Sequence, residues 1–361
     1  MISTKKANYF VKKFFFLTFY CNFATCEHTY TEKTEIKHTA SKTTEPIRHQ
    51  LLTAYMPCND EHTGALFRFS NHQILNLMIG VFDSGYGGLT ILDSIRRRLP
   101  DHDYLYLGDN ARNPYGSRSY EVVYKYTLQG VEYLFSQGCK LVILACNTAS
   151  AEALRTIQQH DLPDIDPDKR VLGVIRPTAE VAGRLTQNNH IGILATQGTV
   201  QSESYIIEIH KLYPNIHVVQ QACPLWVPLI ENKEYATDGA MYFIEKYLSE
   251  LRDKDPLTDT VILACTHYPI IKQHIEKAAK KIWGEHSTPL FVAQGDIVAE
   301  SLENYLLRHP DIDKHATVSC RDYAGSYHTT TYLTTENPDK FNNMAGLFLS
   351  ESVQAQQVTL I

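Results

Sequence analysis

The amino-acid sequence predicts an α/β protein made of two pseudo-symmetric, doubly wound parallel-sheet domains with an active site in the cleft between them. Three observations predict this fold. Short apolar segments alternate with glycine-rich turns and amphipathic stretches from Ile79 onward, which is typical of buried parallel strands separated by helices. Two of these apolar segments recur in the second half of the chain. Polar residues follow the strands, and ligands of such sheets bind beyond the carboxyl ends of the strands.

The first half contains three predicted strands, each followed by a helix. In chain order the elements are a strand at 79–82, a turn at 83–88, a helix at 89–98, a strand at 104–107, a helix at 119–137, a strand at 141–145, and the turn 146–150 that leads into a further helix. The apolar strands are short and uninterrupted, so they are expected to be buried on both faces of the sheet.

The second half repeats this pattern. Val-Ile-Leu-Ala-Cys at 142–146 recurs at 261–265, an offset of 119 residues. Ile-Gly-Val-Phe at 79–82 recurs loosely as Ile-Gly-Ile-Leu at 191–194, an offset of 112 residues. Similar offsets for two separate strands indicate a duplicated α/β unit. Two such units facing each other would bring both sets of strand ends to one cleft.

Domain boundaries follow from this repeat. We predict a first domain at 78–175, joined by the C-terminal segment 290–361, and a second domain at 176–289. Residues 1–77 lack sustained periodicity, and we interpret them as a disordered extension or as translated sequence upstream of the true start. A cleaved signal peptide is the alternative, because two lysines precede a short apolar stretch, but polar residues soon interrupt that stretch.

The composition excludes several classes of protein. The chain has 361 residues, of which 43% are hydrophobic and 20% are charged, which is typical of a globular protein. A net charge of −6 without a long basic block favours a small-molecule partner over nucleic acid. No apolar run approaches the ~18 residues of a membrane span. Eight cysteines without a C-x-x-C pair predict neither a disulfide framework nor a structural zinc site.

Two cysteines stand at equivalent places in the duplication. Cys146 and Cys265 each end a predicted strand and precede polar residues. A single cysteine at such a place is more often a small buried apolar residue, but two equivalent ones favour catalysis. A helix N-terminus also lowers the pKa of a thiol. Zinc binding together with His267 and a disulfide across the cleft are the alternatives. A two-base mechanism explains the symmetric pair better, because one thiolate removes a proton from one face while the opposite thiol supplies one.

Each cysteine has a candidate assistant. Asp83 follows the first strand and could orient or deprotonate a nearby thiol, although it could equally cap a helix. His267 lies two residues after Cys265 and could serve as its acid or base. Three glycines in the turn 83–88 would let the backbone approach an anionic group. Because a P-loop lysine and the Gly-x-Gly-x-x-Gly pattern are missing, no nucleotide is implied.

Four motifs in the chain together resemble those of the bacterial glutamate racemases. They are Asp83-Ser84-Gly85-x-Gly87-Gly88, Pro114-Tyr115-Gly116, Cys146-Asn147-Thr148 and Cys265-Thr266-His267. Further matching segments are Ala195-Thr196-x-x-Thr199, the run from Cys223 to Glu231, and Gln294-Gly295-Asp296. The match covers residues 79–310 in the order and spacing of the family, and the tail beyond Pro310 matches poorly.

The resemblance implies a cofactor-independent isomerase that interconverts L- and D-glutamate and supplies D-glutamate for peptidoglycan synthesis. Cys146 and Cys265 would be the acid/base pair, with Asp83 and His267 as assistants and Glu231 near His267. The residues implied to contact substrate are Asp83, Ser84, Tyr115, Gly116, Asn147, Thr148, Thr266 and His267. No metal or other cofactor is implied. The protein is expected to be a cytoplasmic homodimer that binds neither nucleic acid nor a membrane.

One segment departs from the family pattern. Arg176, in Gly-Val-Ile-Arg-Pro at 173–177, stands where many members carry an acidic or other residue, which affects contacts near the crossing between domains. An aspartate or hydantoin racemase is the alternative within the same architecture and would differ in pocket size. A non-catalytic binding protein is the alternative from another class, but mere binding does not require paired thiols.

Overall fold

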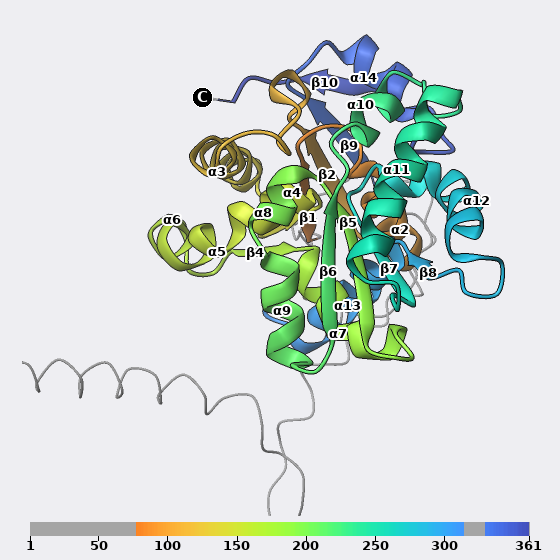
Figure 1. Ribbon diagram of the computed structural model, residues 1–361. Helices are drawn as coiled ribbons and strands as arrows, with labels where there is room; N and C mark the ends of the chain where they lie inside the picture. Colours follow the sequence, from red (N-terminus) through yellow and green to blue (C-terminus); the bar gives the residue numbers. More distant parts are fainter. Residues whose placement is uncertain (1–76, 314–328, 361) are drawn as a thin grey trace, which may run out of the picture. The chain divides into compact units, whose positions relative to one another are not determined.

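The computed structural model describes residues 77–313 and 329–360 (Figure 1). Within them the chain forms two parallel sheets, with strand orders β10-β9-β2-β1-β3-β4 and β6-β5-β7-β8. The predicted fold class is therefore confirmed. Apart from Leu77, the expected extension and its signal-like start lie outside the described residues.

The first sheet and its helices come from both ends of the described chain. Its strands are β1 (Met78–Asp83), β2 (Asp103–Gly108), β3 (Leu141–Leu144), β4 (Arg170–Gly173), β9 (Thr330–Thr334) and β10 (Ala355–Gln357). The helices that belong with it are α2 (Leu89–Arg98), η1 (Asn110–Arg112), α3 (Tyr120–Ser136), α4 (Asn147–Glu152), α5 (Leu154–Thr156), η2 (Ile157–Asp161), α6 (Leu162–Ile165) and α14 (Pro338–Ala345). We call this part the first half.

The second sheet is formed by one continuous stretch, which we call the second half. Its strands are β5 (His190–Ala195), β6 (His217–Ala222), β7 (Thr260–Ala264) and β8 (Leu290–Val292). Its helices are α8 (Gln197–Gln201), α9 (Ser204–Leu212), α10 (Trp226–Glu231), α11 (Asp238–Lys254), η3 (Tyr268–Ile271) and α12 (Lys272–Trp283). Two more helices, α7 (Ile175–Leu185) and α13 (Gly295–Arg308), follow the two points where the chain crosses between the sheets.

The register of the strands confirms the duplication. β1 lies between β2 and β3 in the first sheet, and β5 lies between β6 and β7 in the second. Gly80 pairs with Val142, and Gly192 pairs with Val261. Both offsets seen in the sequence are thus kept in the pairing itself. Every residue of β3 and β7 is buried, which explains why these strands are continuous apolar runs.

Helix α2 shows how local sequence determines an element. Leu89, Leu92 and Ile95 recur at helical spacing and are all fully buried. The helix packs against α13, so its apolar side is covered by the segment that returns from the second half. Three arginines fill the last turn, where positive charge interacts favourably with the helix dipole.

The chain returns from the second sheet to the first later in the sequence than we predicted. β8 pairs with β7, so residues Leu290–Val292, which we had assigned to the first domain with the segment 290–361, lie in the second sheet. β8 is a short edge strand with an exposed first residue, and so it lacks the apolar run that identifies a central strand. The segment rejoins the first sheet at β9, which pairs with β2. The remaining domain boundaries stay predictions.

Among the described residues, no helix has the length and apolar character needed to cross a bilayer.

Candidate active site

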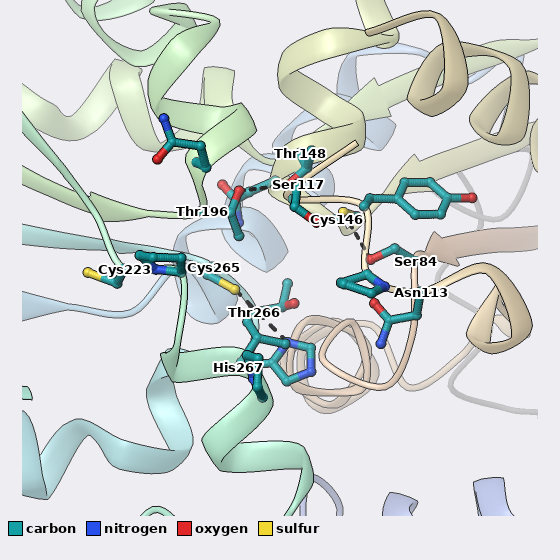
Figure 2. A pocket seen from close by; sticks show the side chains of 18 residues that line it. Ser84, Asn113, Ser117, Cys146, Thr148, Thr196, Cys223, Cys265, Thr266 and His267 are labelled. Atoms are coloured by element: carbon teal, nitrogen blue, oxygen red, sulfur yellow. Dashed lines mark hydrogen bonds between the residues drawn. The ribbon is translucent and has the colours of Figure 1, made fainter. Parts of the chain in front are cut away.

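One cavity lies between the two halves at the carboxyl ends of their strands, with a volume of about 90 Å³ (Figure 2). Most of the predicted site residues line it, namely Ser84, Tyr115, Gly116, Cys146, Asn147, Thr148, Cys265, Thr266 and His267. The other two predicted residues, Asp83 and Glu231, are not among the lining residues. In Figure 2 the thiols of Cys146 and Cys265 enter the cavity from opposite sides, each carried by a different half.

Cys146 lies two residues after the end of β3 and is the N-cap residue of α4. Its sulfur accepts a hydrogen bond from the Ala149 backbone N–H at 3.4 Å, and its thiol donates to the Ser84 hydroxyl at 3.4 Å. Burial, followed by the charge of the nearby Asp83, raises the pKa of this thiol to about 12, and the two hydrogen bonds oppose the rise. The N–H of the helix N-terminus lowers this pKa, as expected, but the loss of hydration on burial outweighs this one hydrogen bond. Cys146 therefore holds its proton at neutral pH.

Cys265 follows β7 and has a different set of neighbours. The sulfur lies 4.0 Å from Nδ1 of His267, and Nε2 of the same ring lies 2.9 Å from Oε1 of Glu231. Burial opposes a charged imidazole, but the hydrogen bonds to Cys265 and Glu231 raise the pKa of His267 to about 10. A positively charged imidazolium thus lies beside Cys265 at neutral pH.

Asp83 ends β1 and is almost completely buried, with 1% of its surface exposed. Its Oδ2 accepts a hydrogen bond from the Gly85 N–H at 2.9 Å, whereas Oδ1 has no hydrogen-bond partner among the described residues. Burial raises the pKa of this carboxyl, and the positive charge of His267 opposes the rise. No hydrogen bond joins Asp83 to Cys146 in the described part of the chain, so the carboxyl acts on that thiol through its charge.

Two of the predicted substrate residues have their side chains engaged within the protein. The amide of Asn147 donates to Oε1 of Gln294 at 2.8 Å and accepts from the Tyr205 hydroxyl at 2.6 Å. Asn147 therefore links α4 to α9 and to the return crossing. The Tyr115 hydroxyl donates to the buried carboxylate of Asp109. For these two residues the structure shows roles in support of the cavity wall, and contact with substrate stays a prediction.

Polar groups from the two halves contact each other along the rest of the cavity wall. The hydroxyls of Thr148 and Thr196 lie 2.9 Å apart, and Thr148 belongs to the first half while Thr196 belongs to the second. Gly116 of the first half accepts a hydrogen bond through its carbonyl from the Gly198 N–H at 2.9 Å. These contacts place hydroxyl and backbone groups along one edge of the cavity, where an anionic group can be bound.

The turn after β1 makes an unexpectedly close approach to the second half. A Cβ at Gly87 would overlap the Thr266 hydroxyl and the His267 imidazole. The hydroxyl of Thr90, just beyond, donates to the Thr266 carbonyl at 3.1 Å. We had expected the glycines of this turn to accommodate an anion. In the structure, Gly87 is needed because any larger residue would separate the two halves.

The lining residues that were not predicted as site residues include Asn113, Thr196 and Cys223, although Thr196 and Cys223 lie in segments that match the family. The repeat could have revealed Thr196, because the offset of 112 residues places it opposite Ser84. Cys223 follows directly after β6, so the strand-end rule applied to it as well. Burial raises the pKa of Cys223 well above its ordinary value, which keeps it a neutral thiol. Asn113 lies in a loop and left no signal in the sequence.

Arg176, the departure from the family pattern, lies away from the cavity on α7. Its guanidinium pairs with Glu180 at 2.9 Å and with Glu208 at 3.1 Å. The substitution therefore affects helix–helix contacts near the first crossing and leaves the cavity wall unchanged.

The duplicated α/β fold carries a thiol at the same strand end in each half, and both thiols face one cavity. The chain matches the family model described as Asp/Glu/Hydantoin racemase over residues 88–291. The chain belongs to this family, as the four motifs predicted.

Two kinds of relative support the assignment. The glutamate racemase of Roseobacter denitrificans is 37% identical over 288 residues, which cover 77% of this chain and 98% of that protein. A glutamate racemase isoform from Bacillus anthracis has a similar structure, with a TM-score of 0.68, 33% identity, and coverage of 79% of this chain and 98% of that one. The glutamate racemase of Francisella tularensis, solved in complex with D-glutamate, has a TM-score of 0.67 and 32% identity over 79% of this chain and 98% of its own.

Proposed function

We propose that the protein interconverts L- and D-glutamate in this cavity by a two-base mechanism, with Cys146 and Cys265 as the acid/base pair. The observation that carries the proposal is that two thiols at equivalent strand ends face one cavity from opposite halves. Family membership supports the substrate, since the curated relatives are glutamate racemases. An α-carbon held between the thiols can lose a proton on one face and gain one on the other.

In the L-to-D direction the thiolate of Cys265 removes the α-proton of L-glutamate and becomes a thiol. The electron pair of the broken C–H bond stays on the substrate as a carbanion. Cys146 then gives its proton to the opposite face and becomes a thiolate, which yields D-glutamate. The reverse reaction begins with a thiolate at Cys146. We assign Asp83 as the assistant on that side and the His267–Glu231 pair as the assistant on the Cys265 side.

The α-proton of an amino acid is a very weak acid, so the carbanion must be stabilised as it forms. Charge develops on the α-carboxylate, and preorganised donors around it lower the barrier. The hydroxyls of Ser84, Thr148 and Thr266 line the cavity and supply such donors. Backbone N–H groups at the start of α4 supply more. Holding the α-carbon between two fixed sulfurs adds the benefit of orientation.

The direct test is incubation of the purified protein with L-glutamate, followed by chiral analysis of the product. We expect equal amounts of the two enantiomers at equilibrium, with no cofactor added. Activity should persist in EDTA and in a carbonyl-trapping reagent, since thiol chemistry requires neither a metal nor pyridoxal phosphate. Loss of activity with either reagent in a folded sample would contradict the mechanism. Racemisation of aspartate or a hydantoin in preference to glutamate would change the substrate, and glutamate binding without turnover would indicate a binding protein.

The biological setting follows from the substrate. D-Glutamate is required for peptidoglycan synthesis, so we propose a role in cell-wall formation and a cytoplasmic location. We also propose a homodimer, which light scattering of the purified protein would test.

A further inference from the structure

Asn113 joins the two halves at the wall of the cavity. It lies in the loop between η1 and α3 and is one of the cavity-lining residues (Figure 2). Its side-chain amide donates to Glu231 of the second half, at 3.0 Å to Oε1 and 3.2 Å to Oε2. One amide group therefore contacts both oxygens of the carboxylate.

The Asn113–Glu231 contact is connected through His267 to the thiol of Cys265. Oε1 of Glu231 is also 2.9 Å from Nε2 of His267, whose Nδ1 is 4.0 Å from the sulfur of Cys265. A line of polar contacts thus runs from the first half, through Glu231 and His267, to the base of the second half. Contact with both oxygens restricts rotation of the carboxylate, so the direction that it presents to the imidazole depends on the other half.

We propose that Asn113 is a positioning residue for the Cys265 side of the site. Its amide holds Glu231 in the orientation that His267 requires, so that this pair is assembled when the two halves meet around the cavity. The catalytic consequence rests on the proposed racemisation, whereas the effect on His267 does not.

The other thiol lacks such an arrangement. The assistant of Cys146 is Asp83, which accepts its hydrogen bond from Gly85 in its own turn, and both residues belong to the first half. Removal of the Asn113 amide should therefore slow proton transfer at Cys265 more than proton transfer at Cys146. This asymmetry separates a positioning role from a general loosening of the cavity.

Isotope effects provide the catalytic test. In Asn113→Ala the overall rate should fall about tenfold, because a hydrogen bond to a charged group is lost. Proton removal by Cys265 becomes slower, so the isotope effect with α-deuterated L-glutamate should rise. The isotope effect with α-deuterated D-glutamate, whose deuteron is removed by Cys146, should fall. Asn113→Asp keeps the shape but loses the donors, and should behave like Asn113→Ala or worse.

Two further comparisons exclude simpler explanations. Asn232→Ala removes the neighbouring amide, which among the described residues donates only to the Pro228 carbonyl at 2.8 Å, and should leave rate and isotope effects as in the wild type. In a Glu231→Gln background, Asn113→Ala should cause no comparable further loss, because Asn113 acts through Glu231. An independent loss, an equal change in both isotope effects, or a rise in KM at unchanged kcat would overturn the proposal.

NMR titration of His267 gives a readout that does not require turnover. The groups facing the ring are Cys265, Glu231, Asp83 and the edge-on ring of Phe348. Release of Glu231 in Asn113→Ala should lower the pKa of His267 from about 10. If the wild type fails to racemise glutamate but this shift occurs, the proposed function is wrong and the positioning role stands. If the wild type is active and the His267 titration is unchanged in Asn113→Ala, the positioning role is wrong.

Discussion

Cys146 and Cys265 occupy the same place in the duplicated fold but are surrounded by different groups. Cys146 caps α4 beside a serine hydroxyl and a buried carboxyl, and burial raises the pKa of its thiol to about 12. Cys265 lies beside an imidazole that Glu231 helps to keep charged. The backbone is therefore symmetric while the charges are not. One wall carries a protonated thiol at neutral pH, and the other wall has a cation beside its cysteine.

This difference in charge affects the two proton transfers unequally. In the proposed mechanism, conversion of L-glutamate requires an acid at Cys146, and the raised pKa of that thiol favours this state. Conversion of D-glutamate requires the opposite state. Because the equilibrium between enantiomers is fixed, the asymmetry cannot appear in the ratio of the two kcat/KM values. It should appear in the individual proton transfers.

The largest expected effect is the loss of either base. Replacing Cys146 or Cys265 with serine raises the pKa of the reacting group far above the ~8.5 of a free thiol, so racemisation should fall by about three orders of magnitude or more. Chiral chromatography of the product measures the loss. Cys139→Ser is the matched control, since Cys139 is buried but does not line the cavity, and it should keep near-wild-type activity. Wild-type racemisation by Cys265→Ser would mean that one base suffices.

The next largest effects are expected for the assisting residues. Asp83 should affect proton transfer at Cys146, and His267 should affect proton transfer at Cys265. Asp83→Asn should slow the step in which Cys146 removes a proton, and His267→Asn the step in which Cys265 does, each by roughly a hundredfold. Primary isotope effects with the two α-deuterated enantiomers should therefore change in opposite directions in the two variants. Parallel changes would show that the two sides are not separately assisted.

Much of this comparison could be predicted from the sequence, because the reactive residues follow buried strands. A strand buried on both faces leaves a continuous apolar run, and the carboxyl ends of parallel strands share one edge. That reasoning correctly brings Ser84, Cys146, Thr148 and Cys265 to one cavity. The repeat further indicates that two halves face each other.

The features of the site that the sequence did not predict depend on contacts between segments far apart in the chain. The partners of Asn147 are Tyr205 and Gln294, and no local pattern connects them. Asn113 meets Glu231 only because a loop folds across the other half. The raised pKa of Cys146 arises from burial, which depends on the completed packing and not on the helix N-terminus visible in the sequence.

The smallest expected effect is on stability and concerns the imidazolium of the Cys265 side. His267 is 4% exposed, and its pKa rises from 6.5 to about 10 on folding. Below pH 6.5 both the folded and unfolded states hold the proton, so the stabilisation is fully present. As the pH rises toward 10, the unfolded state loses its proton first and the stabilisation declines. Each kcal/mol lost would lower Tm by roughly 2–4 °C. Thermal melts from pH 6 to 10 should therefore show a steeper fall in the wild type than in His267→Asn, with Glu231→Gln intermediate. Parallel curves would mean that no buried imidazolium lies beside Cys265, and the two thiols would then no longer differ in the way that their surroundings indicate.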